Sequence, residues 1–337
     1  MAHWCTTTSV SQATVKSLPE VAKTPDKPVP FRPDLHMLNV IFYCATVLIW
    51  GSTWLAIKFQ LGTIAPVVSI CWRFGLASLL LLGFCLLRRL PLRFSAQDQL
   101  FIALQGISLF ALNYLCFYLA ELQITSGLAA VVFSTIVVMN IVNGRIFLST
   151  PLEWRVLLGG GFGLCGLGLL FWPELVAVHF SGAVVSGLLL SIAATYLASL
   201  GNILSARNQR AGLPVIQTNA WGMSYGTLCM LAVALASGAP LQIDTSPAYL
   251  LSLAYLAIFG SVIAFGCYLS LIGRIGAGRA AYSTLLFPLV ALLLSTIWEG
   301  YRWTPAAIGG VLLIAGGNWL ALLKKPLAVP VGNTQRS

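Results

Sequence analysis

The side chains best suited to bind a solute in this chain of 337 residues are polar ones embedded in long apolar runs. A polar group in hydrocarbon is costly unless it meets protein or water, so such residues tend to face a bundle interior or a watery cavity. Arg73 is the strongest candidate, because a guanidinium stays protonated and needs an anion or a route to water. The other substrate-cavity candidates are Trp50, Trp54, Lys58, Asn113, Tyr114, Asn140, Asn202 and Tyr268.

Helical spacing groups several of these side chains on single faces. Trp50, Trp54 and Lys58 recur every four residues, and Glu121 follows Tyr114 by seven. Hydrogen bonds between helices and aromatic belts at the membrane surface are the alternative explanation for such residues. The four that lie deepest in their apolar runs are expected to line a central cavity: Trp50, Asn113, Asn140 and Asn202.

Two glutamates, Glu121 and Glu299, each end an apolar run on the side opposite to most basic residues. A carboxylate at the edge of hydrocarbon can act as a proton or substrate gate, or can simply reach water. Both residues are therefore gate or proton candidates, with helix-end solvation as the alternative.

The remaining chemistry-bearing residues do not indicate catalysis. The chain has no GxxxxGK[ST] phosphate loop, and its histidines, His3, His36 and His179, are scattered. The cysteines show no metal-binding spacing, and nine acidic residues dispersed over both sides argue against a membrane enzyme. We expect no catalytic residue, no metal site and no cofactor.

The amino-acid composition predicts which secondary structure holds these residues. The chain is 58% hydrophobic and 8% charged, with a mean hydropathy of +0.89, whereas soluble domains average about 25% charged residues. This composition excludes a soluble enzyme, a nucleic-acid-binding protein and a disordered protein. It predicts an all-α integral membrane protein with about ten spans of about 20 residues each. The predicted spans are about 38–59, 64–87, 98–120, 125–148, 153–172, 182–206, 214–236, 247–272, 278–298 and 304–323.

The basic residues predict the orientation of these spans. Of the 19 lysines and arginines, 16 fall in one set of alternate segments, which comprises loops and the adjoining span ends, and the opposite loops hold only Arg302. Because cytoplasmic loops carry the excess of Lys and Arg, both termini are predicted to be cytoplasmic in a cell (plasma or inner) membrane. The net charge of +10 is explained in the same way, without a nucleic-acid partner.

Three Ser/Thr-Pro pairs predict where spans begin. Thr150-Pro151-Leu152-Glu153 has the pattern of a capping box opening the fifth span. Ser246-Pro247 and Thr304-Pro305 are predicted to open the eighth and tenth spans in the same way.

An internal repeat divides the ten spans into two groups of five. A shift of 151 residues places Gly127–Ala130 on Gly278–Ala281, and a shift of 149 places Trp72 on Trp221. Five is odd, so the second group must cross the membrane in the opposite direction, as in the inverted repeats of secondary transporters. The predicted divisions are a disordered tail at 1–37, repeats at 38–172 and 173–323, and a tail at 324–337. The glycine-rich fifth and tenth spans are expected to serve packing, within one protomer or in a homodimer.

Several short motifs resemble the EamA domain of the drug/metabolite transporter superfamily. Trp50-Gly51-Ser52-Thr53-Trp54, Pro66 and Trp72-Arg73-Phe74 resemble its opening, and Gly278-Arg279-Ala280-Ala281, Pro288, Trp298-Glu299 and Thr304-Pro305 resemble its close. Two departures stand in the first half: Val137 replaces the expected proline, and Leu148 or Ser149 replaces the glutamate. The resemblance implies transport of small metabolites, often amino acids or related compounds, by alternating access.

The leading hypothesis is therefore a secondary transporter, an exporter of small organic metabolites embedded in the lipid bilayer. The alternative within the superfamily is a flippase for lipid-linked sugars or phospholipids, in which Arg73 and Lys58 would bind a headgroup. A channel is disfavoured because the sequence contains no recognisable filter or charged ring.

Overall fold

The computed structural model describes residues 35–60, 64–176, 181–298 and 303–323, and within these ranges the chain is helical, with no strand. The predicted N-terminal tail, apart from its last residues, and the predicted C-terminal tail lie outside the described residues, as does Glu299.

Helices coincide with each predicted span, some as consecutive segments of different helical type. The first half contains α1 (Leu35–Lys58), α2 (Pro66–Leu87), α3 (Ala96–Ile107), η1 (Ser108–Leu112), α4 (Asn113–Glu121), α5 (Ser126–Ser134), α6 (Ile136–Leu148) and α7 (Trp154–Leu170). The second contains α8 (Trp172–Val176), α9 (Gly182–Arg210), α10 (Val215–Ala236), α11 (Pro247–Tyr255), η2 (Leu256–Ile263), α12 (Ala264–Ile275), α13 (Ala277–Ala280), η3 (Ala281–Leu286), α14 (Phe287–Trp298) and α15 (Pro305–Leu322).

Eight helical stretches among the described residues are long and apolar enough to cross a membrane. The fifth predicted span corresponds to α7, which is apolar but shorter at 17 residues, and the seventh to α10, which is not among the eight. The chain is therefore a multi-pass membrane protein.

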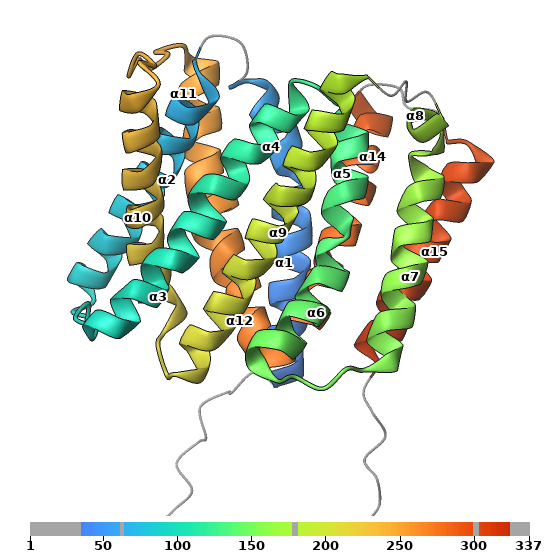
Figure 1. Cartoon of the computed structure of the whole chain (residues 1–337), viewed down its shortest axis with the longest axis horizontal. Coiled ribbons are helices and arrows are strands. Elements are labelled where there is room, and N and C mark those ends of the chain that lie inside the picture. The colour runs from blue at the N-terminus through green and yellow to red at the C-terminus, as the bar shows by residue number, and fades with distance from the viewer. Residues whose placement is uncertain (1–34, 61–63, 177–180, 299–302, 324–337) are drawn as a thin grey trace, which may run out of the picture.

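The helices form one bundle in which α2, α3, α10 and α11 occupy one side and α7 and α15 the other (Figure 1). The start of α1 and the end of α15 lie at the same end of the bundle (Figure 1). Two contacts join corresponding spans of the two halves: α2 packs against α10, and α7 packs against α15.

Glycine faces explain the contact between α7 and α15. A Cβ atom on Gly166 would lie 2.6 Å from the carbonyl oxygen of Gly310, closer than real Cβ contacts allow, whereas one on Gly161 or Gly168 would meet nothing within 4 Å. The glycines on one face of α7 thus let the backbones touch. The two glycine-rich spans pack on each other within the protomer, and a homodimer through their outer faces stays a prediction.

Two of the three predicted helix starts are confirmed. Thr304 accepts a hydrogen bond from the amide of Ala307, Ser246 accepts one from the amide of Tyr249, and a proline follows each cap. The third prediction was wrong: α7 begins at Trp154, and Glu153 makes no side-chain cap bond. Glu153 instead forms an ion pair with Arg279, so a contact from the other half replaces the local capping box.

Two π-helical stretches, η1 and η2, interrupt the α-helical pattern in the third and eighth predicted spans. Such stretches are rare and often lie at functional sites. Both contribute residues to the region described next.

Candidate functional site

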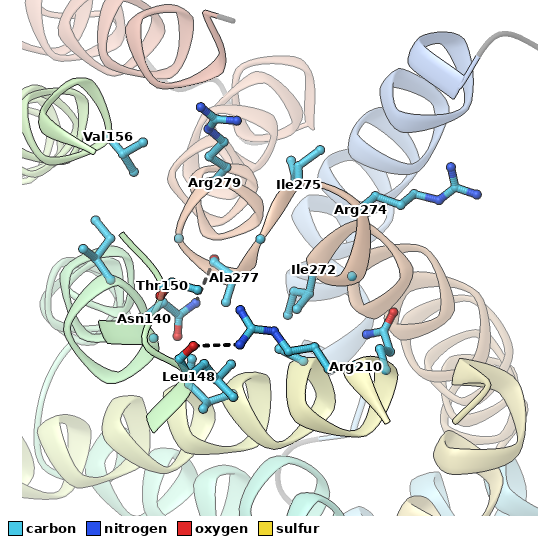
Figure 2. Close-up of a pocket in the computed structure, with 18 of the residues that line it drawn as sticks. Asn140, Leu148, Thr150, Val156, Arg210, Ile272, Arg274, Ile275, Ala277 and Arg279 are labelled. Carbon is cyan, nitrogen blue, oxygen red and sulfur yellow. Dashed lines mark hydrogen bonds between the residues drawn. The ribbon is translucent and has the colours of Figure 1, made fainter. Parts of the chain in front are cut away.

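A cavity of about 780 Å³ lies at the end of the bundle where α6, α9 and α12 end. Its lining comes from both halves and includes Leu148, Arg210, Arg274 and Arg279 (Figure 2). This is the end that carries the predicted cytoplasmic loops, so the cavity opens toward the side rich in arginine.

Three polar side chains meet where Asn140 lines this cavity, and we call Asn140, Asn202 and Tyr268 the polar floor; Asn202 and Tyr268 lie behind Asn140 and are not part of the cavity lining. Each precedes the end of its helix by about two turns. Asn140 lines the cavity and donates a hydrogen bond to the carbonyl oxygen of Ala277, 3.2 Å away (Figure 2). The amide nitrogen of Asn202 lies 3.1 Å from the hydroxyl oxygen of Tyr268 and 3.5 Å from the side-chain oxygen of Asn140.

The polar floor retains an unused hydrogen-bond acceptor. Asn202 is 1% exposed, and its side-chain oxygen has no hydrogen-bond partner among the described residues. A buried polar atom without a partner is costly, so this oxygen favours a hydrogen-bond donor on water or on a solute.

Aromatic rings pack beside the polar floor. The ring of Trp50 lies 5.1 Å from that of Tyr268 and 4.8 Å from that of Phe265, between centroids. Phe265 in turn lies 4.9 Å from Phe110 in η1 and 6.4 Å from Phe74. We call Trp50, Phe74, Phe110, Phe265 and Phe287 the aromatic cluster.

Arg73 adjoins the aromatic cluster through Phe74. It is 3% exposed, and among the described residues no carboxylate lies within ion-pair distance of its guanidinium. Its Nε donates to the hydroxyl oxygen of Ser261, 3.0 Å away, and its Nη2 lies 3.5 Å from the carbonyl oxygen of Gly260. The guanidinium carbon also lies 5.2 Å from the ring centroid of Tyr114 and 5.3 Å from that of Phe74. Within the described part of the chain, the cation is therefore held by neutral acceptors and ring faces.

The π-helical stretch η2 supplies the partners of Arg73. Its Gly260 carbonyl also accepts a hydrogen bond from the indole of Trp50 at 2.9 Å, and its Ser261 hydroxyl donates to the carbonyl of Leu256 at 3.0 Å. These two residues could not be predicted from the sequence, because Gly and Ser in an apolar run carry no mark of a π-helical turn.

The predicted site residues thus fall into two groups. Asn140, Asn202 and Tyr268 meet at the polar floor with Trp50 beside them, and Arg73 and Tyr114 meet near Phe74. The remaining candidates stand apart. Asn113 is buried next to η1 and absent from the cavity lining, and Glu121 ends α4. The side chains of Trp54 and Lys58 are not described, and Glu299 lies outside the described residues.

Sequence reasoning missed one pair at the cavity altogether. The sequence pattern predicts a helix start at Glu153 and a family motif at Arg279, yet the two side chains form an ion pair and both line the cavity. The pair joins residues 126 positions apart, and no local pattern could indicate it.

Comparison with known proteins agrees with this architecture. The sequence pattern of the EamA-like transporter family matches residues 37–172 and again residues 185–323. The inner membrane transporter YedA of Escherichia coli K12 is 31% identical over 324 residues, which cover 89% of this chain and 97% of YedA. A protein of Salmonella typhimurium LT2 named "Probable amino-acid metabolite efflux pump" is 25% identical, over 81% of this chain and 91% of its own length.

A solved crystal structure has a similar fold. It superposes with a TM-score of 0.70 at 17% sequence identity and covers 84% of this chain and 96% of its own. At that identity the likeness concerns the fold alone.

Proposed function

Because the chain belongs to the EamA-like transporter family, we propose that it is a secondary transporter that exports small organic metabolites by alternating access. The observation that carries this proposal is the cavity of about 780 Å³, which reaches from the arginine-rich end to Asn140 of the polar floor, with the aromatic cluster packed behind that floor. A cavity open on one side and closed beyond its polar groups is what one conformation of an alternating-access transporter requires.

Corresponding spans of the two predicted repeats support the mechanism. The packed pairs α2 with α10 and α7 with α15 join the second span to the seventh and the fifth to the tenth. The π-helical stretches likewise fall in the third and eighth spans. Phe110 of η1 belongs to the aromatic cluster, and the carbonyl oxygen of Gly260 in η2 accepts a hydrogen bond from Trp50 of that cluster. An arrangement of ten spans in two inverted repeats of five explains why the second, third and fifth spans match the seventh, eighth and tenth.

The chemistry of the polar floor supports amino acids or related compounds as cargo. The free oxygen of Asn202 can accept a hydrogen bond from an amino group, and the name of the Salmonella relative refers to amino-acid metabolites. The flippase alternative gains no comparable support, since Arg73 is 3% exposed and does not face the lipid in this conformation.

Replacing Asn202 with alanine should lower export of the cargo about tenfold, because the polar floor would lose a buried hydrogen-bonding group worth about 1–3 kcal/mol. The cargo is identified first, as the metabolite that accumulates inside a deletion strain and in the medium of an overexpressing strain. Export is then measured for the variant and normalised to its abundance in the membrane. Ile192→Ala is the matched control, since Ile192 lies exposed on the same helix. No difference in any metabolite between the two strains would contradict the proposed function.

Both termini are expected in the cytoplasm, because 16 of the 19 basic residues lie in segments on that side of the predicted topology. Fluorescent-protein fusions in the 208–212 loop and after residue 325 should fluoresce, and alkaline-phosphatase fusions at the same points should be inactive. Phosphatase activity at either point would overturn the topology.

A further inference from the structure

An ion pair crosses the cavity between the two halves of the chain. The Nη2 atom of Arg279, in α13, pairs with a carboxylate oxygen of Glu153, the residue before α7. Both residues line the cavity, and each side chain keeps 27% of its surface exposed. A molecule inside the cavity can therefore reach both partners.

Arg279 has donor capacity that Glu153 does not use. Its Nε atom is buried and has no hydrogen-bond partner among the described residues. A guanidinium binds a carboxylate best through two parallel N–H bonds, and here one nitrogen is paired while its neighbour is not. This arrangement leaves one donor of the guanidinium without an acceptor.

The other arginines of the cavity are already engaged with neutral groups. Arg210 donates to the carbonyl oxygen of Leu148 at 2.7 Å (Figure 2), and the guanidinium of Arg274 lies 5.5 Å from the ring centroid of Phe42. Together with Arg279 they face Glu153, the one acidic residue among the described residues of the lining. The cavity thus has a surplus of positive charge, and an anion that enters it is attracted.

We propose that Arg279 binds the carboxylate of the transported solute and that Glu153 is the internal competitor for the same guanidinium. The inference rests on the proposed function, because it names the chemical class of the cargo. A carboxylate that replaces Glu153 exchanges one ion pair for another, so little is lost in the exchange. It also removes the link between α7 and α13, and therefore couples occupancy of the cavity to the contact between the halves.

The test measures the midpoint of thermal unfolding of the purified full chain in detergent, at constant ionic strength, against increasing pentanoate or pentanamide. Pentanoate should raise the midpoint of the wild type and pentanamide should not, because only the former carries a carboxylate. Glu153→Gln should lower the half-saturating pentanoate concentration about fivefold, because pentanoate no longer competes with the Glu153 carboxylate for Arg279. A factor of about five corresponds to the free energy of an ion pair that is exposed to this degree. Arg279→Gln should abolish the response.

A second ion pair supplies the matched control. The Nη1 atom of Arg207 lies 3.1 Å from the Oδ1 atom of Asp98, and the two side chains are 26% and 25% exposed. Neither residue lines the cavity. Asp98→Asn should therefore leave the pentanoate response unchanged. If Arg279→Gln does not fold, Arg279→Lys replaces it and should weaken the response, because an ammonium lacks the planar fork.

Four results would overturn the inference: no pentanoate response in the wild type, an equal response to pentanamide, weaker pentanoate binding in Glu153→Gln, or the same gain in Asp98→Asn as in Glu153→Gln. The readout does not require transport. If the carboxylate response stands while the deletion and overexpressing strains export the same metabolites, the proposed function fails alone. If a cargo is exported and the carboxylate response is absent, the inference fails alone.

Discussion

Arg73→Ala is expected to abolish transport while the protein remains in the membrane at close to its normal abundance. An arginine at the centre of a membrane span costs about 2.5–3.5 kcal/mol to insert, so removing it does not by itself oppose insertion. Its partners are a serine hydroxyl, a backbone carbonyl and two ring faces, all of them neutral. A hydrogen bond to a charged group is worth about 1.5–3 kcal/mol, so the loss of one such bond to an anionic solute would lower transport by about a hundredfold.

The measurement is the export rate of the cargo divided by membrane abundance. Arg88→Ala is the control, since Arg88 is an exposed arginine just after the same helix. Arg73→Lys should retain little activity, because lysine lacks the fork that reaches Ser261 and Gly260 together. If Arg73→Ala instead lowers abundance and the surviving molecules transport normally, the arginine has a structural role and the cargo need not be anionic there.

Among the described glycines, Gly106→Ala is expected to cause the largest loss of stability. A Cβ atom on Gly106 would overlap the backbone of Gly222, and its three nearest atoms are the oxygen, the carbonyl carbon and the Cα of that residue. Backbone atoms cannot rotate away, so α3 and α10 would have to separate. Overpacking of this kind costs about 1–3 kcal/mol and occasionally more, and we expect the upper end.

Gly83→Ala provides the comparison, since nothing lies within 4 Å of its Cβ position on α2. Alanine is favoured over glycine inside a helix by about 1 kcal/mol, so this variant should be as stable as the wild type or more so. The two variants are compared by thermal unfolding in detergent and by the fraction of monodisperse protein. Equal unfolding midpoints would show that α3 and α10 are less tightly packed than the structure has them.

Local sequence predicted the helices well and their contacts poorly. Ser246-Pro247 and Thr304-Pro305 begin helices as expected, because a cap and its proline act within four residues. Thr150-Pro151-Leu152-Glu153 does not, because the carboxylate of Glu153 pairs with Arg279 from the other half. The outcome there depends on a distant residue, which no short pattern reports.

The candidate site shows the same division. The free-energy cost of an unpaired polar side chain in the membrane interior is enough to mark Asn140, Asn202 and Tyr268 as candidates. The structure brings those three side chains together. That cost does not indicate that aromatic rings lie between these three side chains and Arg73. Nor does it indicate that η2 supplies the hydrogen-bond acceptors of that arginine. Helical periodicity gives the face on which a residue lies, but not which faces meet.

The contact of α2 with α10 and of α7 with α15 has a consequence for how the protein is made. Each pair is separated by about 150 residues along the chain. At about 5–20 residues per second, α2 and α7 are synthesised about 8–30 s before the helices that cover them. During that interval the glycine face of α7 meets lipid or the insertion machinery instead of its partner. The first half is therefore expected to be a substrate for membrane quality control whenever synthesis stalls between the halves.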